Sequence, residues 1–297
     1  MALTGYQLIK SNPSSAAVTI ATNTAVLFGT TTINPNVDSN VSYSAVTGIF
    51  TFTNAGNYYI SWFVNPQTGT DIDNSFEIQL LPPVGSDVPT NQYPASSVFK
   101  TGQLSGSAIV SPVAGGRVRL INRTTGTITL AIGNGMITAG ISIVSIPTVN
   151  GIQGYLLGTT TTIPSNGIIP YDDPAGDPTN GAVTLDTTTN NGRITFNKPG
   201  TYAIDWWLAI SSATGATEVV LEVIDSSSNV IGASYSAVST NTHITGFTVL
   251  TVSEAQVGAG YYVGLYNSTV DTSSTAIPIG LKALTKNSSI RVIGNAA

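Results

Sequence analysis

The chain has 297 residues, of which 41% are hydrophobic and only 8% are charged, and its net charge is -5. Because disordered chains combine low hydrophobicity with high net charge, this balance predicts an ordered protein whose surface is solvated mainly by Thr, Ser, Asn and Gly. The absence of cysteine excludes disulfides, thiolate catalysis and cysteine-based metal sites. Nucleic acid is not expected as a partner, because phosphate binding depends on clustered Lys and Arg.

The N-terminal segment 1–10 has no basic stretch followed by an apolar one, so we expect no secretory signal there. No apolar run approaches the ~18 residues that a membrane-spanning helix needs. We therefore expect no membrane insertion.

Short strands with alternating apolar residues are the dominant pattern, and no segment shows helical periodicity over ten residues. Strands with one buried face are expected at residues 128–132, 247–251 and 277–281. Turn-forming Gly, Pro and Asn residues separate them. Many short strands divided by turns predict an all-β fold, a sandwich or a barrel.

A hairpin motif in the first half of the chain has an aromatic face. Its first strand ends at Phe52, and its turn ends at Gly56, where we expect a positive φ. Alternation places the large apolar residues of both strands on the inner face, where they should anchor the core. These residues are Phe50, Phe52, Tyr58, Ile60 and Trp62.

The same motif returns 144 positions later, with Gly200 for Gly56 and an inner face of Ile194, Phe196, Tyr202, Ile204 and Trp206. A second pair of matching segments, 118–122 and 263–267, reads Val-x-Leu-x-Asn in both places and lies 145 positions apart. A period of this length is that of a complete domain. The sequence therefore predicts two copies of one domain, residues 1–148 and 149–297, with a boundary near residues 147–151.

Large apolar residues also lie on the opposite face of the hairpin strands. Tyr59 and Phe63 point outward in the first copy, and Trp207 occupies the position that matches Phe63. An outward apolar patch on a β domain indicates a self-assembly interface, with a second buried layer inside the same domain as the alternative.

Three arginines, Arg117, Arg119 and Arg123, form the only basic cluster. Alternation places Arg117 and Arg119 on the opposite side of the strand from Val118 and Leu120. We expect a solvated face, and an anion or subunit contact is the alternative.

Three acids, Asp172, Asp173 and Asp177, share one Pro/Gly-rich loop. Carboxylate oxygens suit a hard cation such as Ca²⁺, so this loop is the candidate metal site. The alternative is a solvated turn in which the Asp side chains bond their own backbone.

Catalytic groups are scarce. His243 is the only histidine. The outward acids Glu218 and Glu222 favour a solvated face, and Asp205 is matched by Ser61 in the other copy, so no catalytic set is duplicated. We therefore expect no enzyme activity. A sugar-binding site is the remaining ligand hypothesis, because Trp207 could stack on a sugar ring beside the acceptor Asp205.

The hairpin Phe-x-x-x-Gly-x-Tyr-x-Ile, the later Val-x-Leu-x-Asn strand and the β-branched strand at residues 141–146 resemble one superfamily. It is the superfamily of the tumour necrosis factor and complement globular-head jelly rolls. The low-charge, Thr/Ser/Gly-rich composition is most similar to the C-terminal domains of bacterial collagen-like glycoproteins of the spore exosporium.

This resemblance implies two tandem two-sheet jelly rolls, homotrimeric assembly through a hydrophobic threefold axis, and a structural or adhesive role at an extracellular or particle surface. Two features depart from it, since the chain has no collagen-like stalk and carries two heads. A double jelly-roll viral capsid or spike protein, and a carbohydrate-binding module that contacts surface glycans, therefore remain alternatives.

Overall fold

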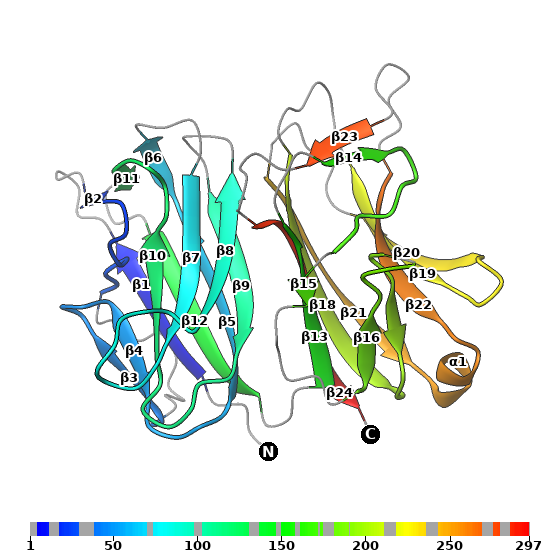
Figure 1. Cartoon of the computed structure of the whole chain (residues 1–297), viewed down its shortest axis with the longest axis horizontal. Helices are drawn as coiled ribbons and strands as arrows, with labels where there is room; N and C mark the ends of the chain where they lie inside the picture. Colours follow the sequence, from blue (N-terminus) through cyan, green and yellow to red (C-terminus); the bar gives the residue numbers. More distant parts are fainter. Residues whose placement is uncertain are drawn as a thin grey trace. The chain divides into compact units, whose positions relative to one another are not determined.

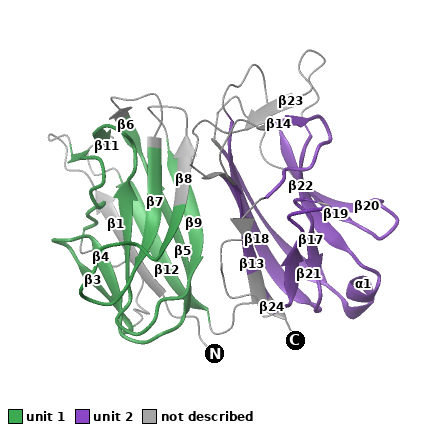
Figure 2. Cartoon of the chain, in the orientation of Figure 1, with its two compact units in different colours: residues 1–147 green, residues 148–297 purple. Residues whose placement is uncertain are grey.

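A computed structural model describes most of the chain, and we describe its two compact units, Met1–Pro147 and Thr148–Ala297, separately (Figure 2). Both units are built almost entirely of antiparallel strands (Figure 1). The described residues are 5–11, 18–29, 39–69, 74–97, 103–130, 137–146, 150–157, 161–171, 173–174, 181–189, 191–210, 218–235, 243–268, 276–279 and 286–296.

The first unit has two main sheets. One has the order β1 (Gly5–Ser11), β12 (Ile137–Ile146), β5 (Asn57–Val64) and β9 (Leu104–Val110). The other has the order β3 (Val41–Ser44), β4 (Ile49–Phe52), β10 (Arg117–Asn122), β7 (Asn74–Leu81) and β8 (Asn91–Ser97). A smaller sheet has the order β2 (Thr19–Ile20), β11 (Ile128–Leu130) and β6 (Pro66–Gly69).

The second unit also has two main sheets and one small sheet. One sheet has the order β15 (Asp173–Pro174), β13 (Asn150–Leu157), β24 (Lys286–Ala296), β18 (Gly200–Ala209) and β21 (His243–Val252). The other has the order β16 (Val183–Leu185), β17 (Ile194–Phe196), β22 (Tyr262–Asn267), β19 (Val219–Ile224) and β20 (Val230–Tyr235). A small pair joins β14 (Thr161–Pro164) to β23 (Ala276–Ile279).

Neighbouring strands in these sheets are mostly distant in sequence. β5 lies between β12 and β9, and β10 lies between β4 and β7; in the second unit, β18 and β22 occupy the same places. The chain therefore crosses repeatedly from one sheet to the other, which is the connectivity of a jelly roll. The prediction of an all-β chain with two jelly-roll sandwiches is confirmed.

The described part contains a single short helix, α1 (Glu254–Gly258). It begins with a capping box, in which Ser253 and Gln256 exchange side-chain to backbone hydrogen bonds. Within the residues that can be described, no helix has the length and apolar character needed to cross a membrane.

The aromatic inner faces predicted from the sequence form the cores. Tyr58 and Trp62 are 3% and 4% exposed, and their counterparts Tyr202 and Trp206 are 0% and 2% exposed. The ring of Tyr58 lies 4.5 Å from that of Phe52, and the matching pair, Phe196 and Tyr202, is 4.7 Å apart. Alternation along the strands therefore predicted the buried face correctly.

The conformation predicted for the turn glycines is wrong. Neither Gly56 nor Gly200 has a positive φ. The left-handed conformation occurs instead at Gly48 (φ 71°) and Gly192 (φ 95°), just before β4 and β17. A Cβ atom on Gly192 would also lie 2.3 Å from the carbonyl oxygen of Ile169, so both φ and space require glycine there.

Candidate functional site

The outer face of the sheet containing β18 and β21 carries two predicted site residues of the second unit, Asp205 and Trp207. Asp205 and Trp207 of β18 pair with Phe247 and Thr245 of β21, and the alternation places all four on this face. Trp207 lies outside the core cluster that contains Trp206, yet it is only 1% exposed. The outward direction of Trp207 is as predicted, but the side chain offers almost no surface.

The exposed apolar residues of this face lie on β21 instead. Phe247 is 63% exposed and Val249 is 58% exposed, whereas Ile244 and Val252, which point inward, are 3% and 4% exposed. β21 is the last strand of its sheet, and it pairs with β18 without a bulge. The alternation of residues 247–251 predicts a strand with one buried face, but Phe247 and Val249, the apolar residues of that alternation, lie on the exposed face. We call these two side chains the β21 patch.

Asp205 is held by an arginine that the sequence did not point to. Nε of Arg291 lies 3.1 Å from each carboxylate oxygen of Asp205, and Nη2 donates a 2.8 Å hydrogen bond to Oδ2. Arg291 is only 2% exposed, and it also donates from Nη1 to Oγ of Ser289. With Trp207 buried and Asp205 bound by Arg291, neither side chain presents a free surface to a sugar in this arrangement.

Tyr59 and Phe63 lie on the outer face of β5, as predicted, and both are half-buried. Phe63 pairs with Gly140 of β12, where a Cβ atom would lie 2.4 Å from the Phe63 ring. The ring therefore lies directly over the glycine. Next to Tyr59, Ile109 of β9 is 0% exposed.

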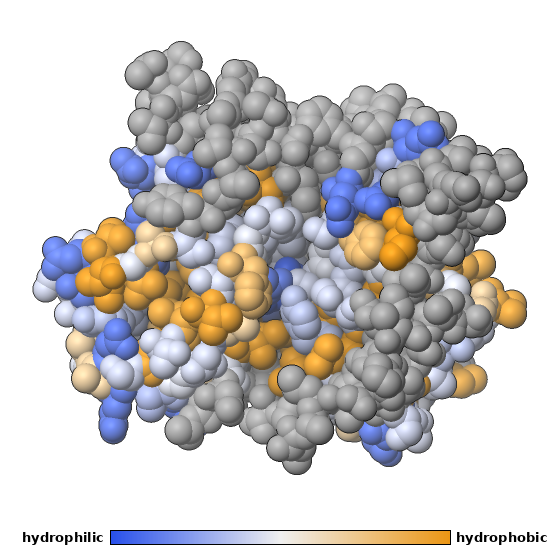
Figure 3. Space-filling view, turned by 180° about the vertical axis from the view of Figure 1, so that it is seen from behind, coloured by the Kyte–Doolittle hydropathy of each residue, from blue (hydrophilic) through white to orange (hydrophobic). Residues whose placement is uncertain are grey.

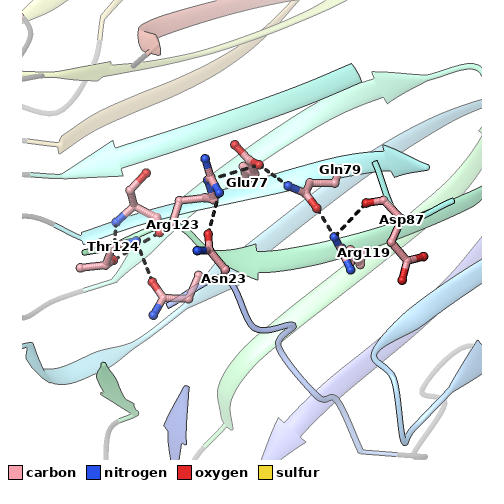
Figure 4. A network of polar contacts seen from close by, with 9 residues as sticks. Asn23, Glu77, Gln79, Asp87, Arg119, Arg123 and Thr124 are labelled. Atoms are coloured by element: carbon pink, nitrogen blue, oxygen red, sulfur yellow. Dashed lines mark hydrogen bonds and ion pairs between the residues drawn. The ribbon is translucent and has the colours of Figure 1, made fainter. Parts of the chain in front are cut away.

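The three arginines of the basic cluster belong to a polar network on the outer face of β7 and β10. Figure 4 shows Arg119 and Arg123 with their partners. Arg123 lies 3.5 Å from Glu77, and Gln79 also donates to this carboxylate. Arg119 donates a 2.8 Å hydrogen bond to Gln79, and Arg117 and Asp87 form an ion pair at 2.9 Å.

Glu77 and Gln79 are 4% and 3% exposed, so the arginines cover buried acceptors. The prediction that this face is solvated is therefore wrong for Arg117, whose side chain is only 12% exposed. It agrees better with Arg123, whose side chain is 41% exposed. Protein acceptors bind each of the three guanidinium groups.

The candidate calcium loop lies mostly outside the described residues, which include neither Asp172 nor Asp177. Asp173 opens β15, and its backbone pairs with Tyr155 of β13. Among the described side chains, no cluster of three or more His, Cys, Asp or Glu residues could hold a metal ion. Calcium at this loop stays a prediction.

The remaining titratable candidates are dispersed. His243 is the first residue of β21, where it pairs with Ala209. Glu218 accepts a 3.0 Å hydrogen bond from Oγ of Ser268, whereas Glu222 points outward from β19.

The surface view agrees with the composition. In Figure 3, apolar and weakly polar residues cover much of the visible described surface, and strongly hydrophilic residues form separate small groups.

The comparisons with known proteins gave only structural similarities. No family model matches the chain, and no curated protein matches it. An Eiger TNF structure from S. frugiperda has a TM-score of 0.37 and 13% identity, over 49% of this chain and 94% of the other. The globular domain of a zebrafish complement 1qA protein has a TM-score of 0.33 and 14% identity, over 49% and 97%. PRD1 vertex protein P5 has a TM-score of 0.32 and 16% identity, over 49% and 99%.

Proposed function

We propose that this protein is a non-enzymatic structural or adhesive surface protein, built from two jelly-roll domains, residues 1–148 and 149–297, that assembles into a homotrimer. The observation that carries the proposal is the β21 patch, in which Phe247 and Val249 are 63% and 58% exposed. Large apolar side chains that share an exposed face are typical of a subunit interface.

The surroundings of the patch favour contact with a second copy of the same chain. The nearest charge on this face, Asp205, is bound by Arg291. At the threefold axis of a trimer the same side chains of all three copies meet, so an unpaired charge there would face its own repeats and oppose association. A face with its charge already compensated avoids this cost.

The two domains are proposed as copies of one ancestor. Supporting this, the Phe52–Tyr58 and Phe196–Tyr202 contacts match, and the two main sheets have corresponding strand orders, with β15 added at one edge in the second unit. In the first domain, Tyr59 and Phe63 lie on the outer face of the corresponding sheet, and we propose them as further interface residues. The trimeric number rests on the sequence resemblance, as does an extracellular or particle-surface location such as a spore exosporium-like layer.

The proposal is tested by the mass of the protein in solution, which light scattering measures after size-exclusion chromatography. We expect three times the chain mass, and a double variant, Phe247→Ser with Val249→Thr, should dissociate. The matched control is Val84→Ser with Val88→Thr, because these valines are 90% and 72% exposed on the other unit. A wild-type monomer across the measurable concentration range would refute self-assembly.

A second candidate is a double jelly-roll capsid or spike protein. The presence of two compact units with jelly-roll connectivity in one chain favours it. Electron microscopy of the purified protein separates the two candidates, because a capsid protein should form closed shells or ordered sheets and the surface module should form discrete trimers.

A further inference from the structure

The second unit has another outward face, on the sheet that contains β19 and β22. Val263 and Leu265 of β22 are fully buried in the core, so Tyr262, Gly264 and Tyr266 lie on the opposite, outer face. Gly264 pairs with Glu222 of β19, which points to the same side. This surface was not singled out by the sequence, apart from the outward direction of Glu222.

The corresponding face of the first unit is closed by its own side chains. There Arg119 of β10 pairs with Gln79 of β7, at the place where Gly264 pairs with Glu222 in the second unit. Arg119 donates to Gln79, which in turn donates to Glu77, so these polar groups bind one another (Figure 4). The second unit has Gly264 where the first has Arg119, so no side chain from this position can bind Glu222.

In the second unit, a tyrosine ring covers that glycine. A Cβ atom on Gly264 would lie 2.8 Å from Cε2 and 3.2 Å from Cζ of Tyr266, so the ring lies against the surface of the sheet. Tyr266 is half-buried, and Tyr262 is 7% exposed. Tyr266 therefore offers the aromatic surface of this face.

Polar groups of opposite character flank the ring. The described residues supply no hydrogen bond or ion pair to the Glu222 carboxylate, which lies beside Gly264. Burial raises the pKa of this carboxyl above its usual value. Arg193 directly precedes β17, which pairs with β22 on the side opposite to β19, and its Cζ lies 4.4 Å from the centroid of the Tyr262 ring.

We propose that Tyr266, Glu222 and Arg193 form a carbohydrate-binding platform. The ring of Tyr266 packs against the apolar C–H face of a pyranose, Glu222 accepts a hydrogen bond from a sugar hydroxyl, and Arg193 donates one to a sugar oxygen. A neutral ligand with many hydroxyl groups satisfies an acceptor and a donor together.

Charged ligands fit this platform less well than a neutral sugar does. A cationic ligand would be attracted by Glu222, but Arg193 already lies over the Tyr262 ring and would repel it. An anionic ligand would in turn be repelled by the Glu222 carboxylate, so a neutral ligand is the one that meets neither repulsion. The platform lies on the other sheet from the β21 patch, so it does not depend on the proposed self-assembly.

The test uses the full chain and a panel of neutral hexasaccharides, namely cellohexaose, xylohexaose, mannohexaose and chitohexaose, with binding measured by titration calorimetry. We expect at least one to bind, and Glu222→Gln and Tyr266→Ala should each lower the affinity about tenfold or more. The matched controls are Glu254→Gln, an exposed acid on α1, and Val230→Ala, an exposed apolar residue on β20. Both controls should bind as the wild type does.

Three results would overturn the proposal: no binding of any of these sugars by the wild-type chain, unchanged affinity in both platform variants, or competition by tetramethylammonium, which would indicate a cation site. Because Glu222→Gln keeps the size of the side chain, it tests the site even if Tyr266→Ala fails to fold.

Discussion

The side-chain amide of Asn267 donates a 3.1 Å hydrogen bond to the carbonyl oxygen of Ile163, more than a hundred residues away in sequence. Asn122 donates to the carbonyl oxygen of Ile20 in the same way, at 2.9 Å. Both asparagines are 0% exposed and end the central strand of a five-stranded sheet, β22 or β10. The repeated Val-x-Leu-x-Asn segment therefore combines two core residues with a buried amide that fixes a distant backbone segment.

Replacing this amide should destabilise the second domain. Asn267→Ala leaves the carbonyl groups of Ile163 and Pro164 without the amide donor, so we expect a loss of about 1–3 kcal/mol in the free energy of unfolding. Urea denaturation followed by circular dichroism measures it. Asn54→Ala is the control, because Asn54 is exposed and bonds only another surface side chain. An equal effect of the two variants would contradict a special role for Asn267.

The aromatic pair Phe196–Tyr202 should contribute more. Tyr202 is 0% exposed, and its hydroxyl donates a 2.7 Å hydrogen bond to the carbonyl oxygen of Lys198. We expect Tyr202→Ala to cost about 3–5 kcal/mol because it opens a cavity in the core. Tyr202→Phe keeps the ring and should cost only about 1 kcal/mol. Thermal or urea unfolding of both variants checks this, and similar losses for the two would show that the hydroxyl, not the ring, dominates.

The sequence predicted those parts of the fold that depend on local alternation. Strand faces follow from a period of two residues, so Tyr58, Trp62 and their counterparts could be placed in the core without coordinates. Short alternating strands divided by turns indicated the all-β class, and the repeat predicted two domains, each closed around its own aromatic face.

The interactions that depend on register between distant strands could not be predicted. Asp205 and Arg291 are 86 residues apart, and only the pairing of β18 with β24 brings them together. The exposure of Phe247 has the same origin, because β21 is at the end of its sheet and no further described strand lies beside its outer side chains. The sequence contained one local indication of which face of β21 is buried. Gly246 lies on the inner face, where the ring of Trp206 packs against it.

A side chain at position 246 should destabilise the second domain. Gly246 pairs with Trp206, and a Cβ atom there would lie 1.9 Å from Cζ2 of the indole. Gly246→Ala must displace a buried tryptophan, so we expect a loss of about 1–3 kcal/mol or more in unfolding free energy. Gly258→Ala is the control, because its Cβ atom would meet no atom within 4 Å and the residue lies in α1. This control should be neutral or slightly stabilising, and a neutral Gly246→Ala would show that the indole moves freely.

The buried ion pair on the outer face of β18 should be costly to break. Asp205→Ala leaves the guanidinium group of Arg291, 2% exposed, without its carboxylate, and we expect a loss of about 3–5 kcal/mol. The double variant Asp205→Leu with Arg291→Met removes both charges and should recover most of this loss. Urea denaturation of the three proteins measures the difference. If the double variant is as unstable as Asp205→Ala, the instability comes from packing and not from the unpaired charge.

The stability of the second domain should depend on pH through Glu222. Burial raises the pKa of this carboxyl above 4.5, so the folded protein binds the proton more tightly than the unfolded chain does. The ionised form therefore destabilises the fold at pH 7, and the penalty disappears as the pH falls through the raised pKa. We expect Glu222→Gln to be more stable than the wild type at pH 7, with the difference shrinking towards pH 4. Parallel urea titrations at both pH values, with Glu254→Gln as the exposed control, test this, and a difference that grows on acidification would give the opposite sign.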